Sequence, residues 1–118
     1  ESTDADADLA RAWIALKTNQ PDLAIVSLDR ILDDAPENAA AQLARGVASF
    51  MLGDFEDAES QFRKHLALTD QSFAGLINLG KVLKEQGKYG EAIDVFRSVD
   101  SGQIPSDGIR TQLADEID

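Results

Sequence analysis

An internal repeat constrains the fold of this chain more than any other feature of its sequence. Residues 53–62 read GDFEDAESQF, and residues 87–96, which lie 34 positions later, read GKYGEAIDVF. A Gly, an aromatic residue, an Ala and a closing Phe recur at the same places in both segments. We call this interval the repeat spacing. Self-similarity at a period of about 20 to 50 residues is typical of repeat architectures, in which each unit packs mainly on its neighbours.

The repeat spacing extends to the first third of the chain. Sets that align at this spacing are Ala24, Ala58 and Ala92; Ala12, Gly46 and Gly80; Leu28, Phe62 and Phe96; and Leu9, Leu43 and Ile77. No insertion is needed between these anchors. The sequence therefore divides into three units, at residues 5–38, 39–72 and 73–106.

Each unit is predicted to form two helices joined by a short turn. In the third unit, apolar or small residues between Leu76 and Leu83 follow the i, i+3, i+4, i+7 pattern of one helical face. Gly87 then allows the positive φ that ends a helix, and a second apolar stripe starts at Tyr89. Helices of about 13 residues with connections of about two to four residues indicate an antiparallel helical hairpin, repeated.

The two ends of the chain differ from the repeats. Gly102 and Pro105 break the chain after the third unit, and apolar residues then recur at every fourth position from Ile109 to Ile117. Because the last hairpin of a solenoid needs a helix with one solvated side, we expect residues 106–118 to form a capping helix. Residues 1–8, ESTDADAD, show no apolar periodicity, and we expect them to be frayed.

The third unit strongly resembles the tetratricopeptide repeat. LINLGKVL at residues 76–83, followed by GKYGEAIDVF, matches that family's Leu–Gly pair on the first helix and its Ala and aromatic residue on the second. The resemblance covers residues 5–106 and is weaker in the first unit, where NQP at residues 19–21 replaces the Gly-containing turn. It implies an all-α, right-handed superhelical solenoid of three helix–turn–helix hairpins plus the capping helix, in a single domain over residues 1–118.

The first helices of units one and two depart from the family pattern. The places of Leu76 and Leu79 hold Asp8 and Arg11 in unit one, and Gln42 and Arg45 in unit two. The apolar stripe lies one residue further along, which is a rotation of about 100° on a helix. Two interpretations remain open. In the first, these helices rotate, or their turns adjust, so that the stripe still faces the core. In the second, small residues suffice for close packing, and the stripe partly lines the inner surface. These small residues are Ala12, Ala15, Gly46 and Ala48.

The resemblance places the first helices of the units along a concave groove, where peptides bind in this family. A contiguous exposed apolar strip there would indicate a partner. Two lysines beside it would suit a peptide with a hydrophobic segment and an acidic residue or a C-terminal carboxylate, although they can equally be ordinary surface lysines. The expected binding residues are Leu9, Trp13, Leu16, Leu43, Val47, Phe50, Ile77, Asn78, Lys81 and Lys84.

One subclass of the family can be tested residue by residue. Repeats that hold the C-terminal tails of chaperones use a clamp of Lys, Asn, Asn, Lys and Arg on the inner helices. At the matching places this chain has Leu9, Trp13, Ala44, Ala74 and Asn78. The sequence therefore lacks the clamp, which argues against chaperone tails as partners.

The composition excludes several classes of function. A formal charge of −11, from 22 acidic and 11 basic residues, would on average repel a nucleic-acid backbone or an anionic membrane. No apolar run approaches the roughly 18 residues of a membrane-spanning helix. The absence of Cys excludes disulfides and cysteine-based metal sites, and it fits a cytoplasmic or a bacterial periplasmic location equally. Because the chain starts at Glu1 without a Met, we expect any targeting signal to lie outside this sequence.

No group of residues indicates catalysis, a metal or a cofactor. His65 is the only histidine, and it takes the place of Ile31 and Val99 in the repeat, so a structural role is expected. Asp4, Asp6 and Asp8 are spaced like the first ligands of a calcium loop, but the required Gly is replaced by Leu9. The sequence thus predicts a non-catalytic protein-interaction module. The alternative is a structural scaffold that oligomerises through the exposed end of the solenoid or docks onto the rest of a larger protein.

Overall fold

The computed structural model describes residues 2–99 of the chain, and the predicted capping helix at residues 106–118 lies outside the described residues. Within the described part, all regular structure is helical, which confirms the predicted all-α class. The six helices are α1 (Ser2–Lys17), α2 (Pro21–Asp34), α3 (Ala39–Met51), α4 (Phe55–Leu68), α5 (Phe73–Glu85) and α6 (Tyr89–Arg97).

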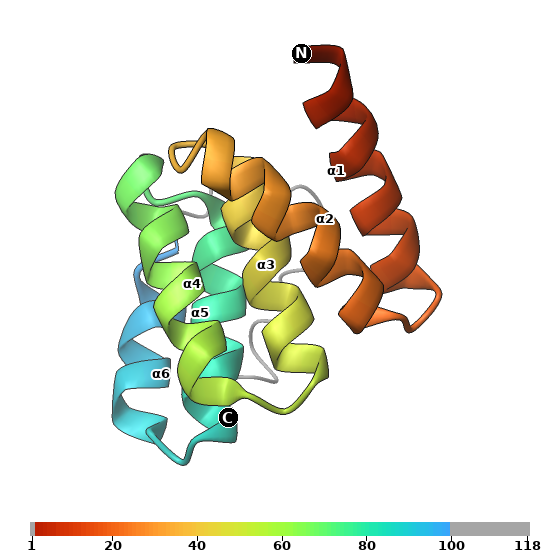
Figure 1. Cartoon of the computed structure of the whole chain (residues 1–118). Coiled ribbons are helices and arrows are strands. Elements are labelled where there is room, and N and C mark those ends of the chain that lie inside the picture. Colours follow the sequence, from red (N-terminus) through yellow and green to blue (C-terminus); the bar gives the residue numbers. More distant parts are fainter. Residues whose placement is uncertain (1, 100–118) are drawn as a thin grey trace.

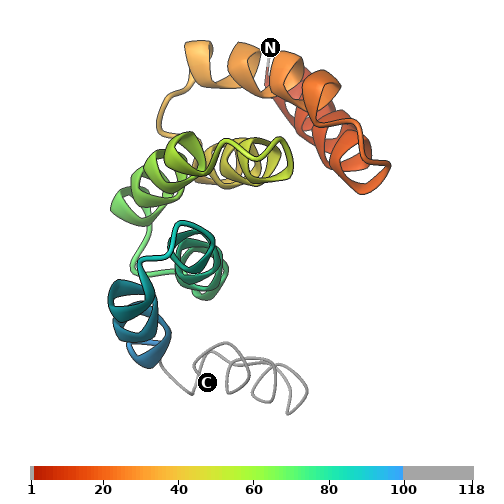
Figure 2. The same cartoon turned by 90° about the horizontal axis from the view of Figure 1, so that it is seen from below.

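The helices form three hairpins, α1–α2, α3–α4 and α5–α6, which stack in chain order (Figure 1). Seen from below, the stack is an arc with α1, α3 and α5 on its inner side and α2, α4 and α6 on its outer side (Figure 2). Helices α2 and α4 each pack on the first helix of the next unit, and α3 also contacts both α1 and α5. The three units predicted from the repeat spacing therefore correspond to three stacked hairpins.

Local chemistry explains where the hairpins turn. The turn glycines Gly53 and Gly87 both have φ of 81°, in the left-handed region that favours glycine. Asn19 holds the matching place in the first hairpin and has φ of 61°, which Asn tolerates better than most residues. The departure NQP in the first unit therefore keeps the same backbone conformation without a glycine.

Polar side chains begin the helices that follow the turns between and within units. Asn38, Asp54 and Ser72 each accept a hydrogen bond from a backbone N–H three residues later, at 3.1, 3.2 and 3.0 Å. These bonds satisfy backbone donors that have no partner within the helix. Capping residues in the local sequence thus determine where α3, α4 and α5 begin.

The start of α1 corrects our expectation of a frayed N-terminal segment. The helix begins at Ser2 and not near Asp8. Asp8 is buried, and its Oδ1 accepts hydrogen bonds from Nη1 of Arg11 at 2.8 Å and of Arg30, on α2, at 3.2 Å. The segment lacks an apolar stripe because a carboxylate, rather than an apolar side chain, fixes this part of α1 to α2.

Two connected apolar cores hold the hairpins together. The first lies among α1, α2 and α3, and the second among α4, α5 and α6, while Val47 on α3 packs against both. In the second core region, Gly80 faces the ring of Phe96 so closely that a Cβ on Gly80 would overlap the ring, and Gly46 faces Phe62 in the same way. These Gly–Phe pairs explain why both residues recur at the repeat spacing.

Candidate partner-binding surface

The inner helices keep the same rotation in all three units. Asp8, Gln42 and Leu76, which occupy equivalent places, have exposed fractions of 7%, 5% and 4%. The interpretation in which α1 and α3 rotate to bury their apolar stripes is therefore wrong. The polar residues stay buried because they have partners from other helices: Arg30 for Asp8, and Gln61, whose Oε1 accepts from Nε2 of Gln42.

Small residues provide the close packing that the second interpretation requires. Ala12 and Ala15 on α1, and Gly46 and Ala48 on α3, are all buried. Their small side chains let the neighbouring helices approach closely, so the larger apolar residues of the same helices are not needed to fill the core. Those larger residues are left between the core and the inner surface.

Nine of the predicted binding residues form three rows across α1, α3 and α5, because equivalent places on these helices are related by the repeat spacing. The rows are Leu9, Leu43 and Ile77; Trp13, Val47 and Lys81; and Leu16, Phe50 and Lys84. On each helix the three residues lie at i, i+4 and i+7, which is one helical face. Two of the three rows change from apolar to basic at α5.

Burial separates one of these residues from the rest. Leu16 has an exposed fraction of 5% and belongs to the core shared by α1, α2 and α3, so its assignment to the groove is wrong. The stripe on α1 alone does not reveal that its last apolar residue belongs to a core shared by three helices. The other eight residues of the rows are half-buried. Their side chains are therefore partly packed and partly accessible to solvent.

The aromatic residue of the third row has a second role. Phe50 packs edge-on against Phe55, with ring centroids 5.2 Å apart and an interplanar angle of 62°. Phe55 is the first residue of α4. Phe50 therefore also supports the α3–α4 turn.

Polar groups follow the rows on α5. Lys81 and Lys84 are half-buried, and Lys81 forms no ion pair with another residue of the described range 2–99. Asn78 uses its Nδ2 to donate a 2.9 Å hydrogen bond to the carbonyl oxygen of Ala74 on the same helix. Lys81 is thus a cation whose charge faces no carboxylate of the described residues within hydrogen-bonding distance.

His65 is structural, as its place in the repeat predicted. Its Nδ1 lies 2.8 Å from the carbonyl oxygen of Ala39, and its Nε2 lies 2.7 Å from Oγ of Ser72. A carbonyl oxygen only accepts, so Nδ1 carries the proton and donates it. The buried ring connects α4 to the first residue of α3 and to the residue that caps α5. Both ring nitrogens thus have a hydrogen-bond partner within the chain.

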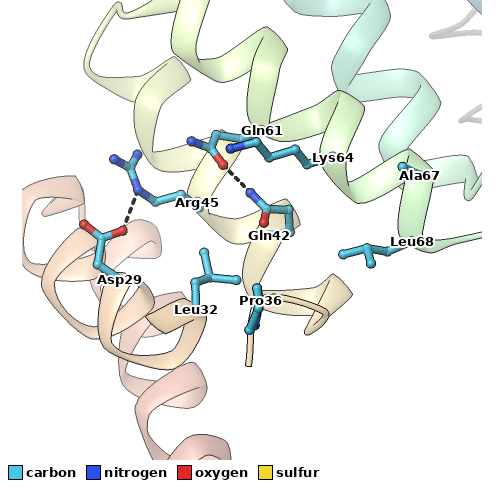
Figure 3. A pocket seen from close by; sticks show the side chains of 9 residues that line it. All are labelled: Asp29, Leu32, Pro36, Gln42, Arg45, Gln61, Lys64, Ala67 and Leu68. Carbon is cyan, nitrogen blue, oxygen red and sulfur yellow. Dashed lines mark hydrogen bonds and ion pairs between the residues drawn. The ribbon is translucent and has the colours of Figure 1, made fainter. Parts of the chain in front are cut away.

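A hollow of about 530 Å³ lies on the outer side of the arc, between α2 and α4 (Figure 3). Its lining residues are Asp29, Leu32, Pro36, Gln42, Arg45, Gln61, Lys64, Ala67 and Leu68. Nε of Arg45 donates to Oδ1 of Asp29 at 3.0 Å, and its Nη1 donates to Oγ of Ser49 at 2.6 Å. Gln42 and Gln61 bind each other. These polar groups of the hollow therefore already have partners within the chain.

The same polar network perturbs an acidic residue. Partial burial raises the pKa of Asp57, but hydrogen bonds with Ser49 and Gln61 and the charge of Arg45 outweigh it and hold that pKa below its usual value. Sequence reasoning did not predict this network. The signal for it was the replacement of Leu76 and Leu79 by Gln42 and Arg45 in the second unit.

A second polar cluster joins units two and three. Glu59 on α4 accepts hydrogen bonds from Nε2 of Gln86 at 2.8 Å, from Nζ of Lys88 at 3.1 Å and from Nε of Arg63 at 2.9 Å. Partial burial raises the pKa of Glu59, but these three donors lower it, from 4.5 to about 2. The charged carboxylate therefore ties α4 to the turn between α5 and α6.

The described residues offer few other kinds of site. No helix within residues 2–99 is long and apolar enough to cross a membrane. Groups of three or more side chains that could together hold a metal ion are also absent from the described part of the chain. The half-buried rows on α1, α3 and α5 form the candidate partner-binding surface.

Comparison with known sequences agrees with the repeat pattern. The sequence model of the family described as "Tetratricopeptide repeat" matches residues 9–73, which is more than half of the chain. The chain is 40% identical over 92 residues to the FK506-binding protein-like protein of mouse and 39% identical over 92 residues to that of human. The match covers 78% of this chain and 26% of each relative, so the chain spans about a quarter of their length.

Solved structures share the same arrangement of helices. The first TPR domain of human RPAP3 superposes with a TM-score of 0.84 at 21% identity, over 95% of this chain and 88% of that one. The TPR2B domain of yeast Sti1, in its complex with an Hsp70 peptide, gives 0.85 at 15% identity, over 98% and 96%. The first TPR of Spaghetti (RPAP3), bound to the HSP90 peptide SRMEEVD, gives 0.86 at 22% identity, over 98% and 94%. These likenesses show the fold.

Proposed function

The chain belongs to the tetratricopeptide repeat family, and on that premise we propose that its inner surface docks an extended peptide or a partner helix. The observation that carries the proposal is the half-buried apolar surface of α1 and α3. Trp13, Leu43 and Val47 pack against the apolar cores, but each of these side chains remains partly exposed. A large aromatic residue fixed in this way is the kind of anchor that dominates binding energies.

The rows also indicate the chemistry of the ligand. The apolar residues of α1 and α3 suit one or two apolar side chains of a peptide, and Lys81 on α5 suits an acidic side chain or a terminal carboxylate beyond them. The ligand would thus cross the three inner helices, with its apolar part over Trp13 and Val47 and its acidic part over α5. Because the whole chain carries a charge of −11, a peptide with several consecutive acids would be repelled elsewhere on the surface.

Chaperone tails fit this chemistry poorly. Two of the structural neighbours are complexes with Hsp70 or HSP90 peptides, and the HSP90 peptide ends in EEVD. In this chain the two clamp places on α1 are occupied by Leu9 and Trp13, and the one on α3 by Ala44. No cation stands at these three places to bind a terminal carboxylate. The proposed ligand is therefore an apolar segment with a single acid, and no catalytic activity or cofactor is part of the proposal.

Affinity measurements with a selected peptide test this function. Peptides from a display library are enriched on the wild-type chain, and the best is titrated while the fluorescence of Trp13, the only tryptophan, is followed. Trp13→Ala, titrated by calorimetry, should weaken binding roughly 30-fold or more, as expected for an aromatic hot spot. Lys81→Glu should weaken it several-fold, and less so at high salt.

A matched substitution on the outer side provides the control. Leu68→Glu introduces a glutamate, as Lys81→Glu does, at an exposed residue of the outer hollow, and it should leave the affinity unchanged. Circular dichroism shows whether each variant keeps its helices. Groove variants that fold and bind as tightly as the wild type, or a loss of binding in Leu68→Glu alone, would exclude the inner surface as the docking site.

A further inference from the structure

A second surface, at one end of the stack, exposes apolar side chains to solvent. Ile14 on α1 and Leu23 and Val26 on α2 have exposed fractions of 63%, 59% and 59%; we call these three residues the end face. A hollow of about 400 Å³ is lined by the end face together with Arg11, Ala15, Thr18, Gln20 and Ser27. Helices α1 and α2 form the first hairpin of the arc, so nothing in residues 2–99 covers this side (Figure 1).

The internal repeat shows what kind of surface the end face is on α1. The places equivalent to Ile14 in the second and third units are Ala48 and Val82, which are both fully buried. Ala48 lies in the core formed with the helices of unit one, and Val82 lies in the core formed with α4 of unit two. Ile14 therefore sits on the side of a first helix that, in the other two units, is packed against a neighbouring hairpin.

The part of the end face on α2 differs in chemistry from its equivalents. In place of Leu23 and Val26, unit two has Asp57 and Ser60, and unit three has Glu91 and Asp94. Glu91 even reaches back to Nη2 of Arg63 in the preceding unit, at 3.8 Å. Polar residues thus suffice at these places when they face water or an ion-pair partner. Apolar residues at the same two places of unit one indicate a surface that is covered.

We propose that the end face binds the end face of a second copy of this chain, in a two-fold symmetric dimer. Charge favours this occupant, because the eight residues that line the hollow include one cation and no carboxylate. In a chain with 22 acids and 11 bases, this is a patch where two copies meet without the repulsion that their other surfaces would cause.

A two-fold contact through the end face also limits the size of the assembly. An isologous contact, in which both copies use the same patch, closes at two subunits.

Sedimentation equilibrium of the purified chain tests the dimer. Over total concentrations from about 1 to about 500 µM, the apparent mass of the wild type should rise by mass action from 12.7 kDa towards twice that value and no further. Ile14→Glu and Val26→Glu should each remain at the monomer mass over the same range. Both replaced residues are more than half exposed, so circular dichroism should show that both variants stay helical.

Two further variants make the test specific. Leu52→Glu adds the same charge at an exposed leucine next to the α3–α4 turn, and it should dimerise like the wild type. Trp13→Ala removes the proposed peptide anchor and should also dimerise, which separates this proposal from the peptide-binding function. A wild type that is monomeric at every concentration, a mass that continues beyond the dimer, or an Ile14→Glu variant that still associates would overturn the proposal.

Discussion

At the scale of single residues, the second unit replaces an apolar pair by an amide pair. Gln42 and Gln61 correspond to Leu76 and Val95 of the third unit, because the repeat spacing relates each glutamine to its apolar counterpart. Gln42 is buried and depends on Gln61 for its hydrogen bond. A buried polar group is costly only when it loses its partner, whereas replacement of both partners by apolar groups of similar shape can be neutral.

This comparison predicts the outcome of a double-mutant cycle. Gln61→Val alone leaves the amide of Gln42 without its acceptor and should lower the free energy of unfolding by roughly 1–3 kcal/mol. Gln42→Leu combined with Gln61→Val copies the pair of the third unit and should recover most of that loss. Urea denaturation of the wild type, of Gln42→Leu, of Gln61→Val and of the double variant gives the coupling energy between the two residues. If the double variant is as unstable as the sum of the two single variants, Gln42 does not occupy the place of Leu76.

At the scale of helices, the cluster around Glu59 connects the second and third hairpins through charge. The folded-state pKa of Glu59, about 2, lies below its ordinary value of 4.5. A depressed carboxyl pKa contributes stability that is fully present above the unfolded pKa and is lost as the pH falls towards the folded pKa. The shift of Asp57 has the same direction. Acid should therefore weaken the contact of α4 with the α5–α6 turn.

Unfolding at several pH values tests this contribution. Glu59→Gln should be less stable than the wild type at pH 7, and the difference should shrink as the pH falls from 4.5 towards about 2. Glu37→Gln, at an exposed residue between α2 and α3, is the control and should follow the wild type throughout. A difference between Glu59→Gln and the wild type that stays constant with pH would contradict the role given to the carboxylate.

The helices also show which parts of the fold could be predicted from the sequence and which could not. The repeat spacing predicted three hairpins and their turns. The residues that define it are turn glycines, which act within their own turn, and Gly–Phe pairs, which recur in the second and third units. The rotation of α1 and α3 did not follow. It depends on Arg30 and Gln61, which lie 22 and 19 residues away from the buried groups they bind. Leu16 was misassigned for a similar reason, because its burial depends on packing among α1, α2 and α3.

At the scale of the whole molecule, different parts of the arc have different roles. The cores and the outer polar clusters hold neighbouring hairpins together, while the inner rows carry half-buried apolar residues next to Lys81. Stacked hairpins contact only their neighbours, so a ligand that crosses α1, α3 and α5 would touch all three units at once. Such a ligand should raise the unfolding temperature of the whole chain progressively as its concentration exceeds the dissociation constant.

The most direct test of the inner surface is a map of amide chemical shifts in the labelled chain, recorded with and without the selected peptide. A chain of 118 residues suits this measurement, and its single tryptophan gives one indole N–H signal. We predict that the largest changes fall on Trp13, including its indole, and on Val47 and Lys81. Changes centred on Arg45 and Lys64 of the outer hollow, with the Trp13 signals unmoved, would contradict the proposed function.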